Sequence, residues 1–381
     1  MRLVHNYPVC EGCIHSSLFK CNKFNEPCPS FSFGTSRYQV ACLSCLTNDS
    51  YEFGIKAPKE ENQKIAYFHM PGPENLSIVQ SLLKFQEFYP EACYENRKVS
   101  EIYGAWPGAI WNGRTTDYGF PTQTIQEIDL VRQKIEALGL TMNLTWNNHL
   151  VSGTDVYDRF CNAITEIFHN GKHSITVASK ELYDYLKEKY PNYKFYQSVI
   201  STSNDTDFVK KDEFDMYLMT RTVNNNWDKL LKIPVEERGN IEFLCNDLCT
   251  PICNRMGHYN IANACLLNRS DETCLGTYCT IDHDFSWYNM HRWPITIKPE
   301  DIDTYLEHDY CHFKICGRYE NKPTIALKFA RYFAKPEFAD DLFFWLLEER
   351  METEQMKKEK IQEELDKARK VLGARANSNN Q

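Results

Sequence analysis

The chain has 381 residues, of which 42% are apolar, and a formal net charge of −9 at pH 7. This length fits one large domain with appendages or two small domains, and the apolar content is sufficient for a substantial core. The negative charge argues against broad electrostatic adhesion to nucleic acid or acidic membranes, although it permits a local basic pocket. No apolar run approaches a membrane span, and the start, MRLVHNYPVC, lacks the apolar core of a signal peptide. We therefore expect a cytoplasmic protein with no membrane partner.

Sixteen cysteines are present, and most of them fall into two clusters. In a reducing compartment, clustered thiols indicate metal binding rather than disulfides. The first cluster lies in residues 1–60, which we expect to form a compact metal-binding appendage, and comprises Cys10, Cys13, Cys21, Cys28, Cys42 and Cys45. Its CxxC pairs favour zinc over a second iron–sulfur cluster, with the ligands being either the two CxxC pairs or the first four cysteines. Such a module commonly holds a partner or nucleic acid.

From residue 65 onward, short β-type runs alternate with helix-length segments. We expect strands at 65–69, 100–103, 141–146, 174–178, 194–200, 216–219, 241–244 and 313–316. Helices are expected at 74–88, 123–138, 154–168, 179–190, 225–233 and 324–334, and Ser179 is a candidate helix cap. Eight strands alternating with helices predict a (β/α)8 TIM-type barrel over residues 61–335. A doubly wound open sheet is the alternative, because periodicity does not prove closure.

Two segments extend this pattern. The connection between the seventh and eighth expected strands is too long for a simple βα unit, so we interpret 245–311 as a cysteine-rich insertion. Residues 336–381 are predicted to form a charged C-terminal helix, over 337–372, and a disordered tail. The apolar positions of that helix keep no clean heptad, which favours a solvated helix over a coiled-coil surface for a protein partner.

The second cysteine cluster begins where the seventh expected strand ends. It contains Cys245, Cys249 and Cys253 at equal intervals, followed by Cys265, Cys274 and Cys279. Thiols with this spacing can converge on one metal centre, and a 4Fe-4S cluster requires four thiolates. Zinc also accepts four thiolates, but its usual CxxC pairs are missing from this segment, so iron–sulfur is favoured. A radical-SAM enzyme is rejected for two reasons: the CxxxCxxC motif of that class has a shorter second interval, and it follows the first strand of the barrel rather than the seventh.

Several polar residues lie just beyond expected strand ends, where barrels build their active face. They are His69, Trp106, Asn147, Ser201, Arg221, Asn246 and Arg318. We interpret His69 and Ser201 as ordinary capping or loop residues. Together, Arg114, Arg221 and Arg318 are candidates for binding a carboxylate or phosphate substrate. Surface arginines paired with nearby acids are an equal alternative.

The sequence resembles peptidase family U32, the collagenase-like proteases, over roughly residues 65–330. The resemblance is carried by EIYGAWPGAIWNGRT, GLTMNLTWNNHL, ITVASKELYDYLKEKYPNYKFYQSVIST, NIEFLCNDLCTPICNRMGHYN and WPITIKPEDIDTYLEHDYCHFKICGR. Its most specific element is the pair Cys249 and Cys253 followed by Arg255 and His258. The N-terminal cysteine appendage departs from the family pattern.

The resemblance implies a barrel with a 4Fe-4S cluster on Cys249, Cys253 and Cys279, with Cys245 or Cys274 as the fourth ligand. It also implies an oxygen-independent hydroxylase or an RNA or small-molecule modification enzyme, acting on an anionic small molecule or a nucleobase. Asn246, Asp247 and His258 are candidates for hydrogen bonding or proton transfer beside the cluster. The alternatives are an accessory metal-binding protein that docks partners through its zinc module or C-terminal helix, and a peptidase. Proteolysis is disfavoured because the sequence has no HExxH motif and no Ser/His/Asp ordering at strand ends.

Overall fold

The computed structural model describes most of the region from residue 64 to residue 348. The described ranges are 64–112, 123–199, 213–220, 223–246, 295–318 and 320–348, together with three short strands near the N-terminus. Those strands, β1 (Ser16–Ser17), β2 (Lys20–Cys21) and β3 (Glu26–Pro27), form an antiparallel sheet. Within the described part of the chain, no helix is long and apolar enough to cross a membrane.

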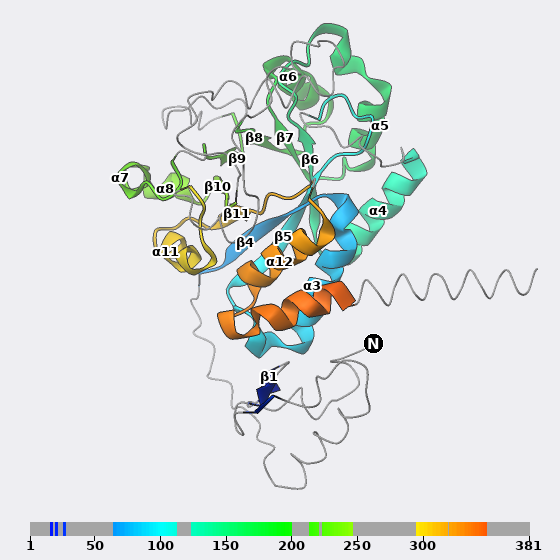
Figure 1. The fold of residues 1–381 in the computed structure, drawn as a ribbon. Coiled ribbons are helices and arrows are strands. Elements are labelled where there is room, and N and C mark those ends of the chain that lie inside the picture. Colours follow the sequence, from blue (N-terminus) through cyan, green and yellow to red (C-terminus); the bar gives the residue numbers. More distant parts are fainter. Residues whose placement is uncertain are drawn as a thin grey trace, which may run out of the picture. The chain divides into compact units, whose positions relative to one another are not determined.

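Eight parallel strands close into a barrel in the order β10-β11-β4-β5-β6-β7-β8-β9 (Figure 1). They are β4 (Ala66–Pro71), β5 (Arg97–Gly104), β6 (Thr141–Trp146), β7 (Ser174–Val177), β8 (Lys194–Gln197), β9 (Met216–Leu218), β10 (Ile241–Leu244) and β11 (His312–Lys314). Closure is made by β11, which pairs with β10 on one side and with β4 on the other. The predicted (β/α)8 barrel is therefore confirmed, and the open sheet is excluded.

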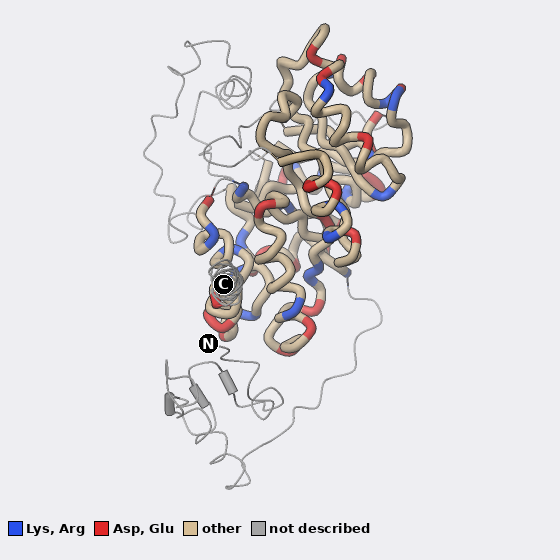
Figure 2. The backbone as a smooth tube through the Cα atoms, turned by 90° about the vertical axis from the view of Figure 1, so that its right-hand side faces the viewer, with Lys and Arg blue, Asp and Glu red and all other residues tan. Residues whose placement is uncertain are grey.

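Helices connect the strands, and local capping explains where several of them begin. They are α3 (Leu76–Phe88), α4 (Ile125–Ala137), α5 (Arg159–Ile167), α6 (Lys180–Lys189), α7 (Trp227–Leu230), α8 (Val235–Arg238), α11 (Ile302–Glu307) and α12 (Lys322–Phe333). A capping box between Thr124 and Glu127 starts α4, and the hydroxyl of Ser179 accepts from the backbone N–H of Leu182 at the start of α6. The expected Ser179 cap is confirmed. Acidic and basic residues are interspersed along the described chain (Figure 2).

A second compact unit contains residues 80–94 and the described residues from 329 onward. Here Trp345 packs against the rings of Phe85 and Tyr89, with centroid distances of 5.6 and 5.9 Å. The Trp345 indole also donates to the carbonyl of Ser81 at 2.9 Å. Residues 339–348 are helical and bury Leu342 and Leu346. These first turns of the predicted 337–372 helix therefore carry a buried apolar face, while the apolar positions on which the prediction of a solvated helix depends lie outside the described residues.

The long β10–β11 connection leaves and re-enters the barrel at one place. The buried side-chain amide of Asn224 donates to the carbonyls of Leu244 and Ile295, each at 2.8 Å. The backbone N–H of Ile297 also donates to the carbonyl of Cys245 at 2.9 Å. Residues 295–311, which lie in the expected insertion 245–311, carry α11 and pack with the barrel through the buried Tyr305. Residues 247–294 lie outside the described residues.

Replacing Asn224 by alanine is expected to lower the free energy of unfolding by about 2 kcal/mol, because two carbonyls lose a buried donor. Urea denaturation measures this difference. The matched control is Asn170→Ala, since Asn170 is exposed and donates to the side chain of Glu136. We expect that change to cost less than about 1 kcal/mol. Equal losses in the two variants would show that Asn224 does not hold the two ends together.

Candidate active site

The interior of the barrel is unusually polar. Residues that pair across neighbouring strands point to the same side, so the register places His69, Glu101, Glu242 and Lys314 inside the barrel. Barrels of this class normally fill these interior layers with Val, Ile and Leu. All four side chains are at most 5% exposed. Buried charges carry a large desolvation cost, so this layer is the strongest candidate for a functional site.

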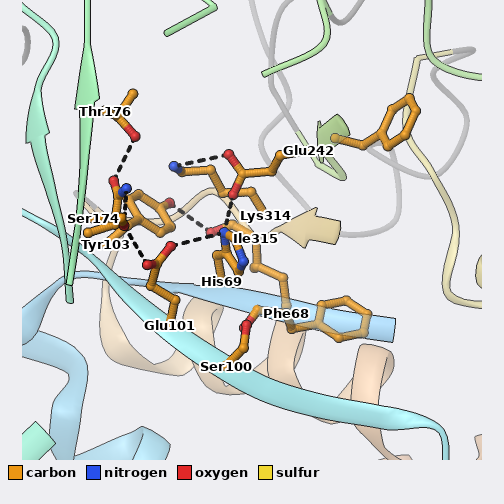
Figure 3. Close-up of polar contacts among 12 residues, drawn as sticks. Phe68, His69, Ser100, Glu101, Tyr103, Ser174, Thr176, Glu242, Lys314 and Ile315 are labelled. Carbon is orange, nitrogen blue, oxygen red and sulfur yellow. Dashed lines mark hydrogen bonds and ion pairs between the residues drawn. The ribbon is translucent and has the colours of Figure 1, made fainter. Parts of the chain in front are cut away.

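These four side chains form one ion-pair network (Figure 3). The imidazole Nδ1 of His69 lies between two carboxylates, in close contact with Glu242 and 3.4 Å from Glu101. The second carboxylate oxygen of Glu242 is 3.5 Å from the Nζ of Lys314. Glu242 is therefore shared by two cationic groups, whereas Glu101 contacts one.

Burial and pairing shift the pKa values of the network in opposite directions. Burial alone would lower the pKa of His69, but Glu242 and Glu101 outweigh it, and the pKa is raised. Burial likewise opposes ionisation of Glu242, but Lys314 and His69 lower its pKa to about 2. For Glu101, burial dominates and raises the pKa. The favoured state pairs an ionised Glu242 with a protonated His69, and the second carboxyl group retains its proton more readily.

A chain of neutral hydrogen bonds continues from Glu101 along β6 and β7. The hydroxyl of Ser174 donates to Glu101 at 2.5 Å and accepts from the amide of Asn143 at 2.7 Å. The hydroxyl of Thr176 donates to the carbonyl oxygen of that same amide at 2.7 Å. The Ser174 hydroxyl is buried and donates its proton to a carboxyl group rather than to a base. It therefore lacks the arrangement of a catalytic nucleophile.

Tyr103 connects the network with the C-terminal end of the strands. The Nζ of Lys314 lies 4.1 Å from the centroid of its ring, and the guanidinium carbon of Arg318 lies 5.6 Å from it. Arg318 also donates to the hydroxyl of Thr145 at 2.8 Å and to the side chain of Asn112 at 3.2 Å. The ring of Tyr103 thus contacts both Arg318 at the rim and Lys314 in the interior of the barrel.

The segment that carries Arg318 is fixed from two directions. The side chain of Asn246 accepts from the backbone N–H of Cys316 at 2.7 Å and donates to its carbonyl at 3.0 Å. That carbonyl also accepts from the Nζ of the buried Lys328 at 3.1 Å, and Lys328 is ion-paired with Glu320. The predicted site residue Asn246 therefore holds backbone next to the rim.

Most of the predicted site residues lie outside the described residues. This applies to Arg114, Arg221, Asp247 and His258, to Cys249, Cys253, Cys274 and Cys279, and to Cys10, Cys13, Cys28, Cys42 and Cys45. Cys21 lies in β2, where only the backbone is described. Among the predicted catalytic residues, the structure places Arg318 and Asn246 at the same end of the barrel. The side chain of Asn246 hydrogen-bonds the backbone of Cys316, and Arg318 lies over the ring of Tyr103.

Sequence reasoning missed the interior network. The interpretation of His69 as an ordinary loop or capping residue is wrong, because β4 continues to Pro71 and His69 lies inside the barrel. Glu101, Glu242 and Lys314 were not singled out. A signal was present, since each is the lone charged residue of an expected strand, in SEIY, IEFL and FKIC. A lone charge at an interior position of a barrel strand indicates a buried ion pair.

Within the described ranges, no group of three or more His, Cys, Asp or Glu side chains is arranged to hold a metal ion. The one proposed cluster ligand that the structure describes with its side chain is Cys245. Its side chain is fully buried, and burial raises the pKa of its thiol well above the ordinary value. Cys274, the alternative fourth ligand, lies outside the described residues.

The fold and the interior network define the class of this protein as a (β/α)8 barrel with a charged core at the C-terminal half of its strands. No protein-family model matches the chain, and no curated protein matches it. Among solved structures, the chain is similar to that of the U32 peptidase Mk0906, with 9% sequence identity and a TM-score of 0.40. The match covers 70% of this chain and 98% of the other.

Proposed function

We propose that this chain is an enzyme that acts on an anionic small molecule or nucleotide at the C-terminal end of its barrel. The observation that supports this proposal is the network of His69, Glu101, Glu242 and Lys314 inside the barrel. A purely structural interior of this size would be less costly if built from aliphatic side chains. Groups with pKa values shifted in opposite directions are instead typical of sites that transfer protons.

The described residues divide the work between binding and proton transfer. Arg318 presents a planar cation at the rim, suited to a carboxylate or phosphate group of the substrate. Lys314, on the other side of the link through Tyr103, supplies positive potential from within the barrel. Glu101 and His69 form the adjacent pair for proton exchange, because the carboxylate lies 3.4 Å from the imidazole Nδ1 and the pKa of each group is raised.

The proposed cofactor is a 4Fe-4S cluster held by Cys249, Cys253 and Cys279, as the sequence resemblance implies. Cys245 and Cys274 are the alternatives for the fourth ligand. Such a cluster would supply electron transfer for an oxygen-independent hydroxylation or a nucleobase modification. The N-terminal cysteines are proposed to bind zinc and to serve recruitment.

Metal analysis of anaerobically purified protein tests the cofactor. We expect about four iron atoms per chain, a brown colour that dithionite bleaches, and an electron paramagnetic resonance signal after reduction. Cys249→Ala and Cys253→Ala should abolish the iron signal. The matched control is Cys311→Ala, because Cys311 lies in the barrel and is partly exposed. A colourless protein with zinc at both sites would support the accessory alternative, and cleavage of casein that survives iron chelation would support a peptidase.

Ligand binding tests the proposed substrate class independently of the cofactor. In a calorimetric titration we expect an aromatic carboxylate such as 4-hydroxybenzoate, or adenosine monophosphate, to bind the wild-type protein. Arg318→Met should weaken binding by about tenfold to a hundredfold, the usual value for a charged hydrogen bond. Arg159→Met is the control, since Arg159 is exposed at the start of α5. Equal affinity of the wild type and Arg318→Met would contradict the assignment of the rim.

A further inference from the structure

The charged network also has a connection toward the opposite, N-terminal end of the strands. His312, the first residue of β11, pairs with Tyr67 of β4 and with Glu242 of β10. Its ring lies 5.6 Å from the ring of His69 and is stacked on the ring of Tyr67 at 5.5 Å. His69 is buried, whereas Tyr67 is 38% exposed. The three rings therefore lead from the interior network to solvent at the N-terminal end.

The chemistry of His312 suits transfer along this line. Its Nδ1 is buried and has no hydrogen-bond partner among the described residues. Buried polar nitrogens are usually satisfied by a side chain, by backbone or by water, and the ring centroids of His312 and His69 lie 5.6 Å apart. Burial and the charge of His69 lower the pKa of His312 to about 4, which keeps the ring neutral at physiological pH. A neutral imidazole accepts a proton on one nitrogen and donates from the other.

The charged groups around His312 maintain this neutral state. Lys98 of β5 and Lys194 of β8 are exposed at the N-terminal end of the barrel. Lys194 and His69 oppose protonation of His312, whereas Glu242 favours it. Glu101 and Lys314 act on His69 and Glu242, so they influence His312 through the network. Two cationic neighbours, Lys194 and His69, thus lower the pKa of His312, and one anionic neighbour, Glu242, raises it.

We propose that His312 is a proton relay between His69 and the solvent at the N-terminal end of the barrel. A proton leaves His69 and reaches one nitrogen of His312, directly or through a water between the rings, and the other nitrogen of His312 releases its proton to solvent beside Tyr67. His312 ends the transfer neutral, and the net change is the loss of one proton from His69. This proposal goes beyond the proposed function, because it concerns how the network exchanges protons whatever reaction it serves.

Exchange of the His69 ring proton with water tests the relay without an enzyme assay. The full-length protein, labelled with 15N-histidine, is measured by NMR at neutral pH, and His69→Gln identifies the resonance. We expect His312→Phe to slow the exchange by about a hundredfold, the lower range of what a positioned acid–base group contributes. His312→Asn, which retains a polar group but cannot pass a proton between two ring nitrogens, should slow the exchange as well.

Two controls make the result decisive. His149→Asn removes another half-buried histidine of the barrel unit, and Arg159→Met changes an exposed cation at the start of α5. Both should leave the His69 exchange rate unchanged within about twofold. If His312→Phe does not fold, His312→Asn decides the question. An unchanged rate in the folded His312 variants, or equally slow exchange in either control variant, would overturn the proposal, because protons would then pass by another route.

Discussion

Glu242→Gln is expected to lower the free energy of unfolding by about 3–5 kcal/mol at neutral pH, the usual cost of breaking a buried ion pair by removing one partner. The carboxylate of Glu242 contacts both His69 and Lys314, and its side chain is fully buried. Glutamine keeps the shape but leaves two cationic groups without their shared counter-charge. Chemical denaturation of the wild type and the variant measures the difference.

Glu101→Gln is the matched control for this prediction. Glu101 lies in the same interior layer, but burial raises its pKa, whereas the pKa of Glu242 is lowered, so the charged form is favoured less at Glu101 than at Glu242. Glutamine resembles a protonated glutamate and can still accept from Ser174. We expect a cost below about 1 kcal/mol. Equal destabilisation by Glu101→Gln and Glu242→Gln would show that the charge is not concentrated on Glu242, contrary to the network described above.

The contribution of His312 to stability is expected to fall by at most about 3 kcal/mol as the pH decreases from about 6.5 to 4. Its pKa is lowered to about 4 in the folded protein, so the unfolded chain binds the proton first and is favoured in this window. His69 acts in a different window. Its pKa is raised, so its contribution is complete below pH 6.5 and is lost as the pH rises through the folded value. The two histidines together predict a stability maximum near pH 6.5.

The difference in unfolding free energy between the wild type and His312→Asn isolates the loss of stability that His312 causes at acidic pH. Denaturation at several pH values between about 4 and 8 should show a smaller acid-side loss in the variant. Glu101, whose raised pKa favours folding as the pH falls, and Glu242, whose lowered pKa matters below pH 4.5, are present in both proteins and cancel to first order. Parallel profiles for the two proteins would contradict the assignment of the acid-side loss to His312.

The order of elements was predictable from the sequence because the signals for strands and helices are local. All eight expected strands overlap β4 to β11, and the N-cap of α6 was anticipated from Ser179. The ends of strands were less predictable, since they depend on pairing across the barrel. The expected strand at 65–69 continues to Pro71, because residues 69–71 pair with residues 101–103 of β5. This extension decided whether His69 was placed outside the barrel or within it.

The candidate site was harder to predict because its members come from β4, β5, β10 and β11. Their contacts depend on barrel closure, which joins the first strand of the barrel to the last, and no local pattern encodes it. Arg318 was anticipated because it follows an expected strand end. Lys328 was not anticipated, because a lysine within an expected helix is normally exposed, whereas here it is ion-paired with Glu320 and buried.

The two hydrogen bonds that Asn224 donates have a consequence for how the protein can change during evolution. Since Leu244 and Ile295 are held by one amide group, the chain between them starts and ends at nearly the same point. Chain can be lengthened, shortened or replaced at such a junction at a small entropic cost, which grows only with the logarithm of its length. Selection can therefore alter the cysteine content of residues 247–294 while the strands on either side keep their register.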